Sequence, residues 1–362
     1  MMLTIQNLTM LRDVISLPKE SLKEICTNLN LPSVGTKDDL AYSIMGRIEG
    51  NRRLQNIALE SVRDRILAGK TTVTWYSSAA QNSLRGAKEL IIRNFHQNPF
   101  EVITVPDPGD LTSTPVLFSA AEGDSPHEYY LRFMWKSGVR RDYYTGTTSP
   151  IQRICNVYIN EEQGAVEIRT EPKSAREVAQ VLFSLIQQRT FMEETRILAP
   201  FGADVERFAD ALGGEFIDTS SKPGLLLDEF TQEQGEAIVQ ILEGLNDYFE
   251  TEDIADLEDN LAQAKDVFGD NLLETPFTAI ILAGLQRVSM GSDKELRGQP
   301  LYDFLSPFLQ HQTGFIRFRY PVNGVFQSHT IRVGLVSNSI YFNTPATEEV
   351  IKHVRQTITA VV

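Results

Sequence analysis

An apolar pattern in the first fifty residues constrains the fold more than any other feature, because it suits two short helices joined by a tight turn. Its apolar positions recur every three or four residues, as one face of a helix requires: Leu22, Ile25, Cys26, Leu29, Leu40, Ile44 and Ile48. Residues 32–35 begin with proline and end with glycine, which predicts that the first helix ends there. Thr36 and Asp39 have the spacing of a capping box, so the second helix is expected to begin at Thr36.

This stretch, written L-K-E-x-C-x-x-L-x-L-x-x-x-G-T-K-x-x-L, resembles the SAP motif, a helix-turn-helix-like module that binds duplex DNA. The resemblance covers residues 17–50 and implies that a helix N-terminus, with Lys37 beside it, faces a phosphate. An ordinary helical hairpin with Lys37 as a solvated surface residue is the alternative.

Basic side chains continue into the next expected helix, over residues 51–67, and extend the expected DNA footprint beyond the SAP-like hairpin. The resemblance and this charge together predict a DNA-binding site. Its expected residues are Lys19, Lys23, Gly35, Thr36, Lys37, Arg47, Arg52 and Arg53.

The net charge of −14 is unusual for a DNA-binding protein until it is mapped along the chain. Residues 1–100 carry 13 Lys and Arg against 9 Asp and Glu, whereas residues 201–270 carry 3 against 19. We therefore expect DNA at the basic head and repulsion of DNA by the acidic segment. The acidic segment is expected to be a solvated surface, or a surface that binds a protein partner; the C-terminal sheet is the other candidate for that contact.

Beyond residue 70, short runs of β-type residues are separated by Pro, Gly, Ser and Asp clusters, as in an antiparallel meander. Strands are expected over 71–76, 101–105, 114–120, 129–135, 142–147, 154–159 and 165–170, followed by a helix that begins near Ser174. Residues 315–342 predict a second sheet, which begins with a hairpin, and a closing helix follows it. Linkers are expected over 213–224 and 289–299.

The fold class expected from these elements is α+β, with antiparallel sheet-plus-helix units flanking a helical middle. The expected segments are a SAP-like head (1–50), a basic helical connector (51–100), a β-meander plus helix (101–190), an acidic, mostly helical region (191–300) and a C-terminal sheet plus helix (301–362). Leu131-Arg132-Phe133 resembles Ile316-Arg317-Phe318, and the helix positions after them share one offset. The two units are therefore either related repeats or two similar, unrelated α+β units.

The sequence does not match most catalytic motifs, and neither a cofactor nor a metal is expected. The nearest approach to a metal-dependent nuclease is Asp107 with Glu167 on an expected strand, but Arg169 stands where such a site needs a lysine. Cys26 and Cys155 are too few for a zinc site and are expected to be buried free thiols.

The function expected from the sequence is non-catalytic binding of duplex DNA, as an adaptor or subunit of a DNA-transaction complex, with a role in defence as one such setting. A metal-dependent nuclease using the 107–169 region and a protein–protein scaffold are the alternatives. No apolar run approaches the length of a membrane span, so we expect no membrane association and a location in the cytoplasm, in the nucleoid, or in the nucleus of a eukaryote.

Overall fold

The structure, a computed structural model, describes residues 2–78, 83–187, 192–223, 231–233, 236–237, 239–241, 243–244, 255–268, 288–291, 295–299, 302, 309–322 and 324–359. Contacts divide the chain into two units, of which unit one comprises residues 1–214 and 317–362 and unit two comprises residues 215–316. The first three segments expected from the sequence fall in unit one, and the other two are divided between the units.

Helices of unit one come mainly from the first hundred residues. In chain order they are α1 (Leu11–Ser16), α2 (Lys19–Asn28), α3 (Lys37–Ile48), α4 (Arg52–Leu59), α5 (Arg63–Ile66), α6 (Ala87–Asn94), α7 (Pro172–Leu185), α8 (Val205–Ala211) and α13 (Glu348–Thr359). The two helices expected over 17–48 are confirmed as α2 and α3. The helix expected near Ser174 begins earlier, at Pro172, because proline suits the first turn of a helix.

Antiparallel pairing builds the sheet of unit one. Its strands are β1 (Thr72–Ser77), β2 (Val116–Glu122), β3 (Glu128–Arg141), β4 (Thr148–Asn160), β5 (Ala165–Arg169), β6 (Glu193–Glu194), β10 (Val325–Gly334), β11 (Ser339–Phe342) and the second part of β9 (Leu309–Val322). The spatial order is β2-β3-β4-β5-β1-β11-β10-β9, with β6 beside β1. Neighbours from β2 to β10 are antiparallel. The α+β class is therefore confirmed.

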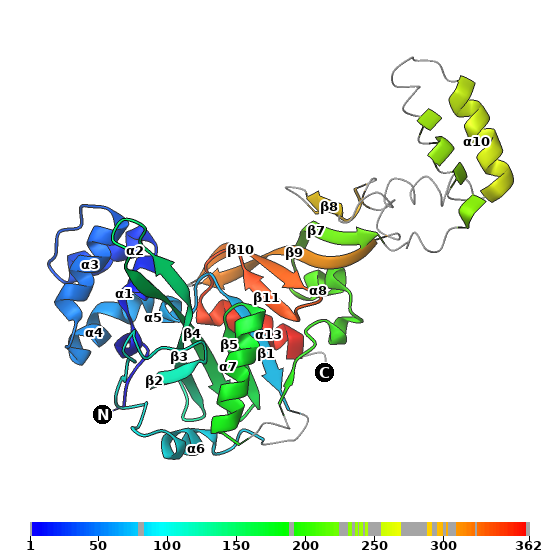
Figure 1. The fold of residues 1–362 in the computed structure, drawn as a ribbon. Helices are drawn as coiled ribbons and strands as arrows, with labels where there is room; N and C mark the ends of the chain where they lie inside the picture. Colours follow the sequence, from blue (N-terminus) through cyan, green and yellow to red (C-terminus); the bar gives the residue numbers. More distant parts are fainter. Residues whose placement is uncertain are drawn as a thin grey trace. The chain divides into compact units, whose positions relative to one another are not determined.

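Each face of this sheet is covered by different helices, because alternate side chains of a strand point to opposite faces. On one face Leu131, Phe133 and Val157 pack with residues of α6 and α7. On the other face Tyr130 and Tyr158 pack with α1 to α5, which we call the head. The head therefore shares its core with the sheet, and Figure 1 shows it in blue beside β3 and β4.

Unit two contains β7 (Glu215–Pro223), which pairs antiparallel with β8 (Val288–Gly291), and the helix α10 (Ala255–Phe268). The ring of Phe216 lies near those of Tyr302 and His311, with centroids 5.9 Å from each. Strand β9 begins in this unit, next to β7. Residues 232–233, 236–237, 239–241 and 243–244 of the helical middle expected from the sequence are helical too, whereas residues 245–254 and 269–287 lie outside the described residues.

Several stretches differ from the secondary structure expected for them. The linker expected over 289–299 begins within strand β8, which pairs with β7. Residues 101–105 are not a strand, since they lie between Pro99 and Pro106, which cannot donate to a sheet ladder. Residues 142–147 form the loop between β3 and β4. The linker expected over 213–224 is largely strand β7, whose partners are distant in the chain.

Candidate nucleic-acid interface

The turn between α2 and α3 is fixed by hydrogen bonds within the chain. Beyond the end of α2, Asn30 adopts a left-handed backbone with φ of 57°. The amide N of Leu31 donates to the carbonyl O of Cys26 over 2.8 Å, which satisfies a carbonyl at the helix end. Leu22, Ile25 and Cys26 are fully buried, so α2 presents its apolar face to the head core. The turn therefore holds the two helices in one arrangement.

A capping box begins α3, as the sequence predicts. The amide N of Asp39 donates to the hydroxyl of Thr36 over 3.2 Å, and the Asp39 carboxylate accepts from the Thr36 amide over 2.9 Å. Gly35 precedes the cap with φ of +144°, and a Cβ there would lie 3.2 Å from the Cβ of Asp39. Gly35 and Thr36 therefore shape the turn through the backbone and the cap.

The first turn of α3 already holds negative charge. Hydrogen bonds from the hydroxyl and amide of Thr36 lower the pKa of Asp39, and the positive charge of Lys19 lowers it further. Asp38 adds a second carboxylate beside Lys37. A DNA phosphate at this helix end would meet two carboxylates, so any attraction has to come from the long basic side chains rather than from the free N–H groups of the helix.

Basic side chains of the head form two groups, one at each end of α3. Lys19 begins α2 and Lys37 begins α3, whereas Arg47 lies in the last turn of α3 and Arg53 in the first turn of α4. The ten residue steps from Lys37 to Arg47 correspond to roughly 15 Å along the helix. Lys37 is half-buried and the other three are exposed. Within the described part of the chain, none of these four side chains has an ion pair.

Two other expected DNA contacts are partly engaged. The ammonium of Lys23 lies 2.9 Å from a carboxylate oxygen of Glu20 on the same helix. Arg52 donates to the carbonyl O of Glu101 over 2.7 Å, so its guanidinium binds the loop before β2. Both residues contribute positive charge to the surface, but part of that charge is already compensated.

A buried ion pair fixes the head on the sheet. Arg132 of β3 donates from Nη1 and Nη2 to the two carboxylate oxygens of Asp13 on α1, at 2.8 and 2.9 Å. Arg132 also donates to the carbonyl O of Leu8. The Arg132 side chain is 1% exposed, and such bidentate pairs have a defined geometry. The sheet and the basic side chains of the head are therefore held in one unit.

The residues expected for a nuclease are not brought together as a metal site. Glu167 lies on β5 with no exposed surface, while Asp107 is exposed in the loop before β2. Among the residues that the structure describes, no group of three His, Cys, Asp or Glu side chains has the arrangement of a metal site. Both carboxylate oxygens of Glu167 are already engaged by side chains of this chain.

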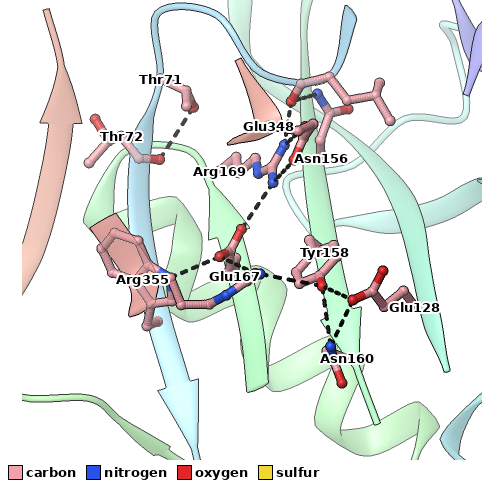
Figure 2. A network of polar contacts seen from close by, with 12 residues as sticks. Thr71, Thr72, Glu128, Asn156, Tyr158, Asn160, Glu167, Arg169, Glu348 and Arg355 are labelled. Atoms are coloured by element: carbon pink, nitrogen blue, oxygen red, sulfur yellow. Dashed lines mark hydrogen bonds and ion pairs between the residues drawn. The ribbon is translucent and has the colours of Figure 1, made fainter. Parts of the chain in front are cut away.

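Figure 2 shows the network around Glu167. Glu167 lies opposite Tyr158 in the ladder, and therefore on the head side of the sheet. Its Oε1 accepts from Nη1 of Arg355 over 2.6 Å and from the indole N–H of Trp75 over 3.1 Å. Its Oε2 accepts from Arg169 over 3.0 Å, and Arg169 also pairs with Glu348 of α13. Two guanidinium groups thus meet two carboxylates.

Charge balance makes this network a structural element. Burial alone would raise the pKa of Glu167, but Arg355 and Arg169 outweigh burial and hold that pKa below its usual value. The guanidinium of Arg355 also lies over the ring of Tyr158, 4.6 Å from its centroid. A carboxylate that is fully ionised and fully bonded is a poor general base, so we assign Glu167 to stability rather than chemistry.

A second group of basic side chains, at the end of the β3–β4 hairpin, was not expected from the sequence. Two adjacent arginines followed by two tyrosines, in residues 140–144, were the available sign. The sequence predicts a strand over residues 142–147, so these side chains were expected to belong to a sheet.

Comparisons with known proteins add no relatives: no protein-family model matches the chain, and no curated protein matches it. In the part of the chain that the structure describes, none of the helices combines the length and apolar character that crossing a membrane requires.

Proposed function

We propose that this protein binds duplex DNA through its head and does not cleave it. The observation that carries the proposal is the placement of Lys19, Lys37, Arg47 and Arg53, which present unpaired positive charge at both ends of one helix. The net charge of the chain is −14, so these local groups of positive charge stand out from the rest of the protein. They favour binding of a polyanion such as DNA, because each contact with a phosphate releases condensed counterions. The resemblance of residues 17–50 to the SAP motif supports the same ligand.

The test is a titration of duplex DNA at several salt concentrations, measured by fluorescence anisotropy. The variant Lys19→Glu/Lys37→Glu is expected to bind more weakly than the native chain and to show a smaller slope of log affinity against log salt, by about two units. The control is Arg93→Glu/Lys173→Glu, which makes the same charge change at exposed sites on α6 and α7. Equal weakening by both pairs, or no binding by the native chain, would contradict the proposal.

We further propose that unit two supplies the contact with a protein partner, so that the chain acts as an adaptor or subunit of a DNA-transaction complex in the cytoplasm, nucleoid or nucleus. Exposed acidic side chains on α10, among them Glu258, Asp259 and Asp266, support a basic partner surface. A crosslinking experiment with the native chain and an α10 variant in which these three acids are replaced by Gln and Asn tests it. Unchanged crosslinks in the variant would contradict this assignment.

A further inference from the structure

The β3–β4 hairpin extends well past the part of the sheet that is covered by the core. Its buried stretch ends at Trp135, and every residue from Val139 to Ser149 is exposed. The pairing nevertheless continues to Arg141, which lies opposite Thr148. The five residue steps from Lys136 to Arg141 correspond to roughly 17 Å of extended strand. We call residues 136–153 the arm.

The loop at the tip of the arm is held in one conformation by hydrogen bonds. Asp142 accepts from the amides of Tyr144 and Thr145 over 2.8 and 3.2 Å, and its own amide donates to Thr147 over 2.9 Å. These hydrogen bonds lower the pKa of Asp142, so its charge is used to hold the turn. Gly146 adopts a left-handed backbone with φ of 71°, which closes the loop. The side chains on the tip therefore have a defined backbone beneath them.

The arm carries concentrated positive charge and exposed aromatic surface. Its basic residues are Lys136, Arg140, Arg141 and Arg153, and its one acid is Asp142. Within the described residues, these four basic side chains have no ion pair. Tyr143 and Tyr144 at the tip are 89% and 103% exposed.

The arm lies in the same unit as the head and next to it. Met10, which precedes α1, and Ile154 both pack against a small apolar cluster at the base of the arm that includes Met134. Lys136 is two residues from Met134 and Gln152 is its partner in the ladder, so Lys136 lies on the sheet face that the head covers. The bulge after Lys136 shifts the alternation, which places Arg141 on that face too and Arg140 on the other.

We propose that the arm is a second contact for duplex DNA, a two-stranded ribbon that enters the major groove while the head binds the neighbouring backbone. The proposal rests on the proposed function of the head for its ligand. A two-stranded ribbon fits the major groove, which is about 12 Å wide. Arg140 and Arg141 then reach the phosphates on either side of the ribbon, and Tyr143 and Tyr144 lie against sugars and base edges.

The test compares Arg140→Glu/Arg141→Glu with the native chain in the same salt titration. Loss of two phosphate contacts lowers the salt slope by about two units and the affinity by roughly 60-fold at 0.1 M salt. Tyr143→Ala/Tyr144→Ala is expected to weaken binding and leave the slope unchanged, because these contacts release no counterions. All four positions are exposed, so unchanged thermal unfolding should accompany both variants.

A charge-matched control variant and a comparison of duplex with single-stranded DNA separate the possible failures. The control Arg93→Glu/Lys173→Glu measures the effect of net charge alone; if the arm variant weakens duplex binding no more than this control while the head variant does, the arm proposal is wrong and the head proposal stands. Weakening by the arm variant alone supports the arm and contradicts the head. Tighter binding of single-stranded than of duplex DNA, lost in the tyrosine variant, overturns the ribbon-in-groove geometry. Absence of any DNA binding by the native chain overturns both proposals.

Discussion

Glu167 and Arg355 are 188 residues apart in the chain, yet a carboxylate oxygen of one lies 2.6 Å from a guanidinium nitrogen of the other. Glu167 is fully buried and the side chain of Arg355 is 7% exposed. The pair joins α13 to β5 on the face of the sheet that the head also covers. Because neither charge is solvated, each depends on its partner.

Replacing Glu167 by Gln is expected to lower the free energy of unfolding by about 3–5 kcal/mol, since Arg169 and Arg355 would keep their charges with only Glu348 to compensate them. Urea denaturation measures the change. The matched control is Arg176→Ala, which breaks the ion pair with Glu194; the Arg176 side chain is 61% exposed, so about 0–1 kcal/mol is expected. Equal losses in the two variants would show that the buried network contributes no more than a surface pair.

Asp13→Ala is expected to weaken the attachment of the head. Arg132 would remain buried without a carboxylate, and the expected loss of stability is about 3–5 kcal/mol. Limited proteolysis should then cut within residues 17–50 sooner than in the native chain, because local opening of the head becomes easier. Glu20→Ala removes an exposed pair from the same head and serves as the control. Proteolysis at the native rate in Asp13→Ala would show that the apolar core alone holds the head.

The elements that could be predicted from the sequence are those set by neighbours in the chain. The capping box of Thr36 and Asp39 depends on residues three apart, and the helices around it depend on apolar spacing within 32 residues. Cys26 and Cys155 are buried free thiols, as the scarcity of cysteine indicates. The β-type residues of 71–76 and 165–170 likewise predict β1 and β5, although the structure buries both faces of these strands.

Long-range pairing explains what could not be predicted. The partners of β7 include β8, about 70 residues later, so residues 213–224 looked like a linker when considered alone. Glu167 looked like a metal ligand because the sequence places a carboxylate on a strand but does not show the guanidinium of Arg355 beside it. The arm was missed for a similar reason: only the register of β3 with β4 shows that residues 142–147 form a tip.

Stability is expected to fall as the pH drops from about 7 toward 5, through two histidines of unit one. Burial lowers the pKa of His329, and the charge of Arg65 lowers it further; burial also lowers the pKa of His353. The unfolded chain, with histidine pKa near 6.5, therefore binds more protons in this range than the folded chain does. The stabilising contribution of the two neutral histidines is therefore complete above this pH range. It is lost as the pH falls through the range toward the pKa of each histidine in the folded chain.

His329→Leu checks this dependence. The His329 ring is 2% exposed and lies 5.8 Å from the ring of Phe318, so leucine changes the packing but removes the titrating group. Thermal unfolding between pH 5 and 8 should show a flatter profile in this variant, since any packing cost is the same at every pH. The exposed His127, replaced by leucine, should leave the profile as it is in the native chain. If His329→Leu keeps the pH dependence of the native chain, other titratable groups set that dependence.

Gly35→Ala tests the turn that places Lys37. At φ of +144° an alanine is strained, and its Cβ would lie 3.3 Å from a carboxylate oxygen of Asp39, which caps α3. We expect a loss of about 1–2 kcal/mol in the free energy of unfolding. Gly46, on the same helix, has open space at its Cβ, so Gly46→Ala should stabilise the chain slightly. A neutral Gly35→Ala would show that the cap tolerates a different backbone.

Lys37→Glu is the sharpest single test of the head as the DNA-binding surface. The change removes one positive charge and adds a third carboxylate to the first turn of α3, beside Asp38 and Asp39. Each phosphate contact contributes about 0.9 to the slope of log affinity against log salt, so the slope should fall by about one unit, and by the same amount for unrelated duplex sequences. Lys265→Glu makes the same change on α10, where Lys265 is exposed among acidic side chains, and should leave the slope unchanged. A loss confined to one DNA sequence would mean that Lys37 contacts a base, and an equal loss at Lys265 would mean that net charge, rather than the head, sets the affinity.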